Sequence, residues 1–430
     1  MIEIIPFTHK INADIKAPSS KGHTLRAFFI AALAKGESII KEPLFAEDQT
    51  YAIKSLENFG ICFETKKEKL IIKGTGGKLE LPRKNIFIGN SGVTARFLAS
   101  FAALSPKGKI IIDGVKRMRT GRPIQDLLNS LARLGVKIKS IPGTGCLPVE
   151  IEGDSFNGGK SRLKGSISSQ YFSSILISSP YAKQNTTIEC IGKMSSKPYI
   201  DITIKMMKDF GVRVKNYNYK KFFVKAGQKY IAREYKIEGD YTNASYFFTA
   251  AAVCKGKIKI RNLKLDSAQG DKVFLDILKK MGCKIKKEKE KITVISNGNL
   301  KPIKIDMNSY PDLVPTLAVL CAFIKGKSEI LNIYHLRFKE CDRLKAVANE
   351  LRKAGVNIKE GKDRLIINGN PDKLHSAQIE CYNDHRMAMA FSILGLKVPG
   401  IVIKDEKCVR KSFVDFYEVF KEIGGRYKIL

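Results

Sequence analysis

The chain has 430 residues, of which 44% are hydrophobic, and this length and composition predict a globular protein of two or three domains. The apolar stretch "LVPTLAVLCAFI" (313–324) ends short of the roughly 18 residues that cross a bilayer. The first residues, "MIEIIPFTHK", lack the basic segment and apolar run of a signal peptide, so we expect none. The nine cysteines include no C-x-x-C pair and indicate reduced thiols in a cytoplasmic protein rather than disulfides or a zinc site.

The formal net charge of +34 leaves two classes of partner open, nucleic acid and small polyanionic substrates. The lysines are spread over the whole length without a basic tail, which is typical of solvated faces. Several arginines instead lie in motifs that contain glycine or serine, so they are the better candidates for specific anion binding.

One short signature recurs six times at near-even intervals: apolar, two polar, apolar, glycine, apolar, polar, apolar. Its first half has helical spacing, its glycine suits the left-handed residue after a helix, and its alternating tail predicts a strand. The glycines are Gly60, Gly135, Gly211, Gly282, Gly355 and Gly424. A second strand usually follows, as in "KLIIKG" (69–74), and another helix precedes, as in "TARFLASFAAL" (94–104). The implied repeat is βαβαββ, which places the chain in the α/β class.

The sixth repeat is incomplete at Leu430, and the strand-like residues 1–18 precede the first repeat. We therefore expect residues 1–18 to complete the sheet of the last repeat. Three repeats would form a domain of residues 19–230, and the other three would form a second domain of residues 1–18 and 231–430. Two hinged domains with a cleft between them would follow.

The first half of the chain carries cationic and hydroxyl groups at predicted helix starts. "APSSKGHTLRAFF" (17–29) places Lys21 and Arg26 where a helix attracts anions, with Ser19 or Ser20 as its cap. "GNSGVTARF" (89–97) frees backbone N–H groups at Gly92 to face an oxyanion, one helical turn before Arg96. Three further helix starts carry, respectively, Arg122 before a proline, Ser168 with Ser169 and Gln170, and Ser196 with Tyr199.

The second half carries acids next to cations. Asp312 follows a proline at a predicted helix start, Asp384, His385 and Arg386 open an apolar helix, and Lys411 enters the last helix. In "LRFKECDRLKA" (336–346), helical spacing would place Lys339 and Arg343 on one face, where like charges repel. We interpret them as separate anion contacts and Glu340 as a proton donor rather than an ion-pair partner. Each motif alone is also explained by ordinary capping; helix starts gathered into one cleft would make a strongly positive hollow suited to multiply charged substrates.

Six motifs, taken together and in order, closely resemble the family of 3-phosphoshikimate 1-carboxyvinyltransferases, or EPSP synthases: "SSKGHTLR", "GNSGVTARF", "SISSQYF", "SSKPYIDIT", "RFKECDRL" and "YNDHRMAM". The resemblance implies a two-domain inside-out α/β barrel, the enolpyruvyl transferase fold, with three βαβαββ units per domain. It implies transfer of the enolpyruvyl group of phosphoenolpyruvate to the 5-hydroxyl of shikimate 3-phosphate through a tetrahedral intermediate, in the pathway to chorismate and the aromatic amino acids. It further implies a cytoplasmic monomer without metal or cofactor, acting on small molecules and not on nucleic acid or membranes.

The resemblance also implies the site residues. Asp312 would be the base for the 5-hydroxyl, Glu340 the acid that protonates the methylene carbon, and Lys21 a third catalytic group. Shikimate 3-phosphate would contact Lys21, Gly22, Arg26, Ser168, Ser169, Gln170, Ser196, Tyr199, Asp312, His335 and Lys339. Phosphoenolpyruvate would contact Lys21, Gly92, Arg122, Gln170, Arg343, His385, Arg386 and Lys411.

The chain departs from the family pattern at four positions. Gly22 replaces a serine, so one hydroxyl contact to shikimate 3-phosphate is missing or comes from Ser20 or His23. Val93 and Phe97 replace residues of the glycine loop, whereas Gly92 is kept, and we predict inhibition by glyphosate. His335 stands where some members have asparagine.

Three other functions remain possible from the sequence. UDP-N-acetylglucosamine enolpyruvyl transferase shares the repeat, but "DGVKRMRTG" (113–121) lacks its reactive cysteine. An RNA 3′-phosphate cyclase-like protein would suit the basic charge, and it would need His385 as its nucleotide acceptor. A polyanion-binding scaffold without catalysis is disfavoured by the intact pair Asp312 and Glu340.

Overall fold

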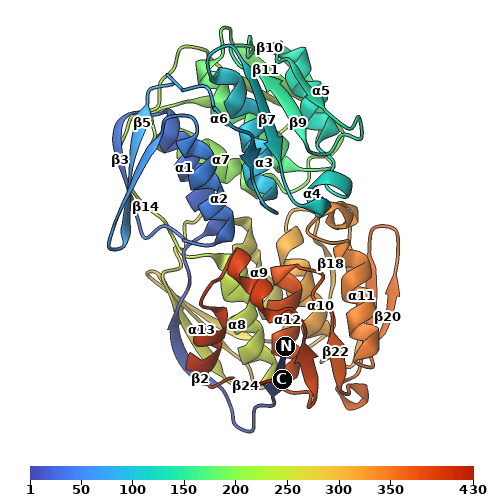
Figure 1. The fold of residues 1–430 in the computed structure, drawn as a ribbon. Coiled ribbons are helices and arrows are strands. Elements are labelled where there is room, and N and C mark those ends of the chain that lie inside the picture. The colour runs from blue at the N-terminus through green and yellow to red at the C-terminus, as the bar shows by residue number, and fades with distance from the viewer. The chain divides into compact units, whose positions relative to one another are not determined.

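The computed structural model describes residues 1–430 and divides the chain into two compact units. The N-terminal unit is Ser19–Ile237, and the C-terminal unit combines Met1–Pro18 with Glu238–Leu430 (Figure 1). The boundary predicted at residue 230 is therefore too early. Strand β14 (Glu234–Lys236) pairs in parallel with β3 (Lys35–Lys41), and this pairing keeps residues 231–237 with the N-terminal unit.

Each unit contains three four-stranded sheets, six in all. In the N-terminal unit the strand orders are β14-β3-β5-β4, β6-β7-β9-β8 and β10-β11-β13-β12. The additional strands are β4 (Cys62–Lys66), β5 (Lys69–Thr75), β6 (Ile86–Phe87), β7 (Lys109–Asp113), β8 (Ile138–Ser140), β9 (Val149–Glu152), β10 (Gly159–Lys164), β11 (Thr186–Ile191), β12 (Val214–Tyr217) and β13 (Lys221–Val224). The helices are α1 (Lys21–Leu33), α2 (Glu47–Glu57), α3 (Gly92–Phe101), α4 (Lys116–Thr120), α5 (Gln125–Arg133), α6 (Ser169–Ser178) and α7 (Lys197–Asp209).

The C-terminal unit repeats this plan with orders β16-β17-β15-β2, β18-β19-β21-β20 and β22-β23-β1-β24. Its strands are β1 (Ile2–Ile5), β2 (Asn12–Lys16), β15 (Lys257–Arg261), β16 (Lys284–Glu288), β17 (Lys291–Ile295), β18 (Lys304–Asp306), β19 (Gly326–Leu331), β20 (Asn357–Glu360), β21 (Leu365–Gly369), β22 (Ala377–Ile379), β23 (Ile401–Ile403) and β24 (Arg426–Ile429). Its helices are α8 (Tyr241–Val253), α9 (Val273–Met281), α10 (Val314–Ala322), α11 (Arg343–Lys353), α12 (His385–Gly395) and α13 (Phe416–Glu422).

The βαβαββ repeat is confirmed by six four-stranded sheets that share one pairing plan, and in three of them one strand comes from a distant part of the chain. In the sheet of β6–β9, β6 and β7 are parallel, and α3 lies between them in the chain. Strands β8 and β9 follow α5, and β9 pairs in antiparallel fashion with both β7 and β8. The predicted glycines are confirmed as well, because all six have positive φ, from 82° at Gly60 to 115° at Gly282. Glycine adopts this conformation without steric cost, which lets each helix turn sharply into its strand.

The N-terminal residues supply strands to two different sheets, which corrects the expectation that they complete only the last one. Strand β1 pairs with β23 and β24, and Ile2 faces Ile429, so both chain ends lie in the last sheet (Figure 1). Strand β2 instead pairs in parallel with β15 and completes the first sheet of the C-terminal unit. Strand β14 has the same role in the first sheet of the N-terminal unit.

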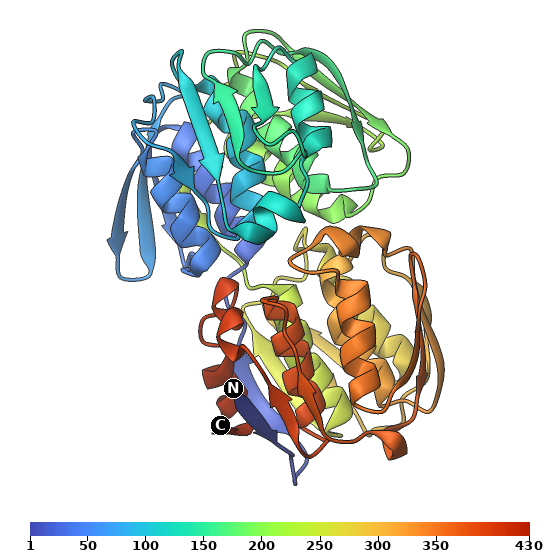
Figure 2. The ribbon, with the colours of Figure 1, turned by 45° about the vertical axis from the view of Figure 1, so that its right-hand side comes forward.

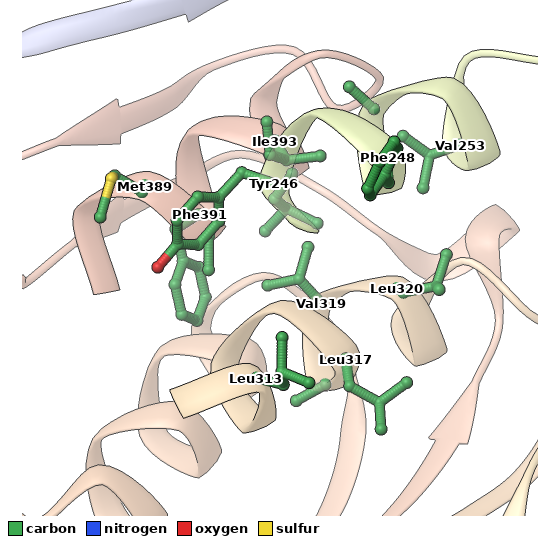
Figure 3. Packing of buried hydrophobic residues seen from close by; sticks show 14 of the residues in the cluster. Tyr246, Phe248, Val253, Leu313, Leu317, Val319, Leu320, Met389, Phe391 and Ile393 are labelled. Carbon is green, nitrogen blue, oxygen red and sulfur yellow. The ribbon is translucent and has the colours of Figure 1, made fainter. Parts of the chain in front are cut away.

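The helices lie inside each unit and the sheets lie outside, as Figures 1 and 2 show for both units. Every residue of α8, α10 and α12 is buried, and these three helices pack on one another. Figure 3 shows Phe248, Val319 and Ile393 among the side chains that fill the space between them. Burying one such side chain stabilises the fold by about 1.5–3 kcal/mol, so the apolar helices hold their polar N-terminal residues in place. No helix is both long and apolar enough to cross a membrane.

Candidate active site

The candidate residues form two sets, one in each unit. Several of the polar side chains lie at the starts of buried apolar helices, such as Lys21 on α1 and Arg386 on α12. The hydrophobic sequence of the helix body fixes the helix in the core, while its first residues are free to carry charge. The nine cysteines are all free thiols, and no cluster of His, Cys, Asp or Glu in residues 1–430 is arranged to hold a metal ion.

In the C-terminal unit, Arg343 is the centre of a cluster of carboxylates. Its side chain is 1% exposed at the first position of α11. The guanidinium donates from Nη1 to Asp312 Oδ1 at 2.7 Å and from Nη2 to Glu340 Oε2 at 2.8 Å. Its Nε atom donates to Asp384 Oδ2 at 2.7 Å. One buried cation thus fixes three acids that are far apart in the sequence.

The structure corrects two sequence-based interpretations of residues 336–346. Lys339 and Arg343 do not share a helix face, because α11 begins only at Arg343 and Lys339 lies in the turn after a 3-10 segment, Tyr334–Phe338. Glu340 is an ion-pair partner of Arg343, contrary to expectation, since the turn folds its carboxylate back onto the guanidinium three residues later. The interpretation of Lys339 and Arg343 as separate anion contacts stays a prediction.

Two more cations complete this cluster. Arg386, at the second position of α12, donates from Nη2 to Asp312 Oδ2 at 2.8 Å. Lys411 is 4% exposed at the end of a 3-10 turn, Glu406–Lys411, and its Nζ lies 3.8 Å from Glu340 Oε1. Both acids with predicted catalytic roles therefore contact Arg343 through one oxygen and a second cation through the other.

The electrostatic balance keeps Asp312 ionised. Burial alone would raise the pKa of Asp312, but the positive charges of Arg386 and Arg343 outweigh it and hold that pKa well below its usual range. A carboxylate in this state is a poor base. Anions that drew the two arginines away would raise its pKa and make it a better one.

The two predicted histidines in this unit are buried and differ in surroundings. Burial and then the charge of Lys339 lower the pKa of His335 to about 3, so its ring is neutral at neutral pH. His385 is 1% exposed, and its Nδ1 lies 3.7 Å from Asp384 Oδ1. Asp384 also caps α12 by accepting the backbone N–H of Arg386 at 3.0 Å. The sequence indicated Asp384 beside His385 without assigning it a role, whereas the structure makes it a partner of both Arg343 and α12.

In the N-terminal unit, Arg26 is buried among neutral oxygen atoms. Its Nε donates to Thr203 Oγ1 at 2.7 Å, and its two Nη atoms donate to the carbonyls of Gly22 at 2.8 Å and Tyr199 at 3.0 Å. Burial lowers the pKa of Arg26 to about 10, so the group stays charged at neutral pH. These contacts join the start of α1 to the start of α7 around a positive charge.

Lys21 and the serines that precede it lie at the same end of α1. The Nζ of Lys21 lies 2.6 Å from Asp48 Oδ2, and Asp48 is buried. Ser20 is at the predicted cap position, but its side chain does not bond the helix backbone. Its Oγ lies 3.1 Å from His23 Nδ1 instead, so the two side chains that were expected to replace the missing contact near Gly22 contact each other.

The start of α3 brings Gly92 and Arg122 together. Arg122 is 4% exposed and donates from Nη1 to the carbonyl of Asn90 at 3.2 Å. A Cβ atom at Gly92 would clash with the Arg122 guanidinium, lying 2.6 Å from its Cζ. Glycine therefore leaves room for the guanidinium at the helix start, where N–H groups already favour an anion.

The starts of α6 and α7 hold the remaining predicted residues. Ser168 caps α6 by accepting the N–H of Gln170 at 3.3 Å, and Ser169 is buried beside it. The Gln170 Oε1 accepts a hydrogen bond from Arg96, a residue that the sequence noted one turn into α3 but did not include in the site. Ser196 precedes α7 with a left-handed φ of 56°. The only sequence signal for Arg96 was its place in the motif of Gly92, because its contact with Gln170 joins residues 74 positions apart.

Comparisons with known proteins agree over almost the whole chain. The family model described as EPSP synthase (3-phosphoshikimate 1-carboxyvinyltransferase) matches residues 6–420. The chain is 42% identical to the 3-phosphoshikimate 1-carboxyvinyltransferase of Nostoc punctiforme, over 97% of this chain and 98% of that protein. It is 40% identical to the protein of the same name from Methanocaldococcus jannaschii, over 99% of each chain.

A solved structure shares the fold. The EPSP synthase from Acinetobacter baumannii matches with a TM-score of 0.82 at 24% identity, over 100% of this chain and 99% of that one. The two-domain enolpyruvyl transferase fold implied by the sequence motifs is thereby confirmed.

Proposed function

The chain belongs to the EPSP synthase family, and we propose that the two sets of side chains described above bind its two substrates. The chain transfers the enolpyruvyl group of phosphoenolpyruvate to the 5-hydroxyl of shikimate 3-phosphate and releases phosphate. The family match favours this reaction over UDP-N-acetylglucosamine enolpyruvyl transfer, RNA cyclisation and a scaffold role.

The chemistry requires two carboxyl groups with opposite proton states. In the addition step the 5-hydroxyl oxygen attacks C2 of phosphoenolpyruvate and loses its proton, while the methylene carbon C3 gains one. In the elimination step C3 loses a proton and the C2–phosphate bond breaks, which restores the double bond in the product. As the family resemblance implies, we assign Asp312 as the base for the hydroxyl and Glu340 as the acid for C3, and Arg343 contacts both carboxylates.

Substrate binding would change the state of Asp312. Before binding, Arg386 and Arg343 are paired with it and keep its pKa low. Arginine binds carboxylate and phosphate groups well, so bound phosphoenolpyruvate would compete with Asp312 for Arg343 and Arg386. The pKa of Asp312 would then rise toward the range of a useful base. The ion pairs thus act as a device that readies the base only when the substrate is present.

As the sequence motifs imply, phosphoenolpyruvate is assigned to a set of mainly cationic and polar residues: Lys21, Gly92, Arg122, Gln170, Arg343, His385, Arg386 and Lys411. The burial of Arg343, Arg122 and Lys411 supports this assignment, since buried cations favour an anionic partner. The space that Gly92 leaves for the Arg122 guanidinium at the start of α3 supports an anion-binding role of this helix start. Inhibition by glyphosate remains a prediction, which a Ki far above the KM for phosphoenolpyruvate would refute.

Shikimate 3-phosphate is assigned to the second group of residues: Lys21, Gly22, Arg26, Ser168, Ser169, Gln170, Ser196, Tyr199, Asp312, His335 and Lys339. Arg26 supports this assignment because the charge of its guanidinium contacts only neutral oxygens. A phosphate monoester carries up to two negative charges and suits such an environment. The neutral ring of His335 would serve as a hydrogen-bonding group rather than as a cation.

One observation carries the proposal: a single buried arginine contacts the two carboxylates to which acid and base roles are assigned. The test is release of inorganic phosphate when the purified protein is mixed with phosphoenolpyruvate and shikimate 3-phosphate. We expect stoichiometric release that needs both substrates. Phosphate release that needs UDP-N-acetylglucosamine in place of shikimate 3-phosphate, or no release with either acceptor, would overturn the proposal.

We further propose that the enzyme acts as a cytoplasmic monomer and needs no added metal or cofactor. The nine free thiols support a reducing compartment. Light scattering at micromolar concentration would give a mass near 48.0 kDa for a monomer, and a doubled mass would refute this part. Activity unchanged by EDTA would support the absence of a metal requirement.

A further inference from the structure

The segment that leads into α12 has an unusual backbone. Tyr382 and Asn383 both lie in the left-handed region, with φ of 54° and 51°. Asparagine tolerates this region, but a bulky side chain such as tyrosine rarely adopts it. The next residues are Asp384, which holds Arg343, and Arg386, which contacts Asp312. Strained backbone therefore lies directly before two arginine contacts of the candidate site.

Helix α11 holds this segment at two points. Arg343, at its start, bonds Asp384. Glu350, seven residues and about two turns later on the same side of the helix, forms the second attachment. Its Oε1 accepts the hydroxyl of Tyr382 at 2.6 Å, and its Oε2 accepts the backbone N–H of Glu380 at 3.0 Å. The segment 380–384 is thus bonded to one rigid helix on both sides of the left-handed pair.

Glu350 is fully buried, and its carboxylate contacts Tyr382, the backbone of Glu380 and Lys353. Lys353 Nζ lies 2.8 Å from Oε2 and balances the carboxylate. A buried carboxylate is costly unless it is paired and hydrogen-bonded, so this acid is not an ordinary core residue. Burial and then the bond to Glu350 raise the pKa of the Tyr382 phenol, which keeps its hydroxyl a donor.

We propose that Glu350 and Tyr382 are positioning residues that hold the left-handed turn and thereby fix Arg386 and Asp384 for phosphoenolpyruvate. Neither touches the reacting atoms. We call the contacts of Glu350 with Tyr382 and with the backbone of Glu380 the clamp. The clamp fixes the turn at Tyr382 and Asn383, and this turn sets the start of α12. The start of α12 in turn orients Arg386. This inference rests on the proposed role of Arg386 in binding phosphoenolpyruvate.

The test compares Tyr382→Phe with Tyr417→Phe. Each change removes one hydroxyl from a tyrosine in the same unit, but Tyr417 bonds Ser392 rather than the clamp. We expect Tyr382→Phe to raise the KM for phosphoenolpyruvate about tenfold, the scale of one lost bond to a charged group, with kcat and the KM for shikimate 3-phosphate within about twofold. Tyr417→Phe should leave all three unchanged. An unchanged KM for phosphoenolpyruvate in folded Tyr382→Phe would overturn the inference.

A rescue separates positioning from general loss of stability. Glycine adopts positive φ freely, so Asn383→Gly added to Tyr382→Phe should lower the raised KM by at least about threefold. A raised KM that glycine does not lower would contradict the role of the turn. If Tyr382→Phe does not fold, Glu350→Gln, which keeps the shape of the side chain, must show the same KM effect, and a wild-type KM there would refute the clamp.

Arg386→Lys distinguishes failure of this inference from failure of the proposed site. Lysine keeps the charge but loses the two-pronged geometry. If Arg386→Lys leaves the KM for phosphoenolpyruvate unchanged, the assignment of Arg386 fails and the clamp fails with it. If Arg386→Lys raises that KM and Tyr382→Phe does not, only the clamp is wrong.

Discussion

Arg343 in the C-terminal unit and Arg26 in the N-terminal unit are both buried, yet their partners differ in kind. Arg343 bonds three carboxylates, whereas Arg26 bonds a hydroxyl and two backbone carbonyls. The first arginine is neutralised by acids, and its own pKa lies well above the ordinary value because these acids outweigh the effect of burial. Arg26 has no carboxylate among these partners, and burial lowers its pKa to about 10.

The difference separates two tasks. A cation that faces only neutral oxygens retains its full charge for a permanently anionic ligand such as a phosphate monoester. A cation shared among acids instead controls when those acids can give or take a proton. The contrast predicts that changes near Arg26 act on binding, while changes near Arg343 act on stability and on proton transfer.

Arg343→Met should give the largest effect, because three carboxylates would lose their shared cation. We expect the free energy of unfolding to fall by about 3–5 kcal/mol and activity to disappear. Urea denaturation measures the first and phosphate release the second. Arg410→Met, at an exposed arginine of the same unit, is the control and should shift stability by less than about 0.5 kcal/mol. Equal stability of the two variants would refute the claim that Arg343 stabilises the fold through its three carboxylates.

Asp312→Asn should lower kcat by at least about 10²-fold, since the amide cannot accept the hydroxyl proton. Steady-state kinetics with both substrates measures this effect. Asp276→Asn, at an exposed acid of the same unit, should leave kcat unchanged. A loss seen only in KM would mean that Asp312 binds substrate without acting as a base.

Arg26→Lys should weaken binding of shikimate 3-phosphate by about 10- to 30-fold, because one ammonium group cannot replace three directed donors in this geometry. Titration calorimetry with shikimate 3-phosphate alone measures it. Arg133→Lys, at an exposed position of α5, is the matched control. If Arg26→Lys lowers kcat and leaves affinity intact, the division of tasks between the units is wrong.

The pH dependence of stability should give the smallest effect. The pKa of Asp312 is lower in the folded protein than in the unfolded chain, so its contribution is complete above about pH 4 and is lost as the pH falls further. Wild type should therefore lose more stability than Asp312→Asn between pH 5 and pH 2, in urea titrations at each pH. Parallel losses in the two proteins would contradict the lowered pKa.

The local part of the fold could be predicted because it depends on short patterns. Gly282 and its five equivalents end helices wherever the signature occurs, and this requires only the sequence around each glycine. The partner of β2 could not be predicted, since residues 12–16 fit the edge of any of the incomplete sheets and only packing in the folded unit selects β15. The same limit explains why the boundary at residue 230 was too early.

For the site, residue types and order were enough to propose Asp312, Glu340, Arg343, Arg386 and Lys411, which the structure links by direct contacts within one unit. The pairing of Glu340 with Arg343 was missed because a charge pattern does not reveal whether a turn folds an acid back or outward. The clamp from Glu350 to Tyr382 was missed for a related reason: its partners are 32 residues apart and join only through tertiary packing.

In the proposed reaction Arg343 presents two carboxylates with opposite tasks, and Glu340 delivers the proton to carbon. The direct measurement is deuterium incorporation at C3 of phosphoenolpyruvate and product, followed by mass spectrometry during turnover in D₂O. Wild type should incorporate deuterium through reversible addition, and Glu340→Gln, saturated with both substrates, should incorporate it at least about 10²-fold more slowly. Deuterium incorporation at the wild-type rate in Glu340→Gln would show that Glu340 does not deliver the proton to C3.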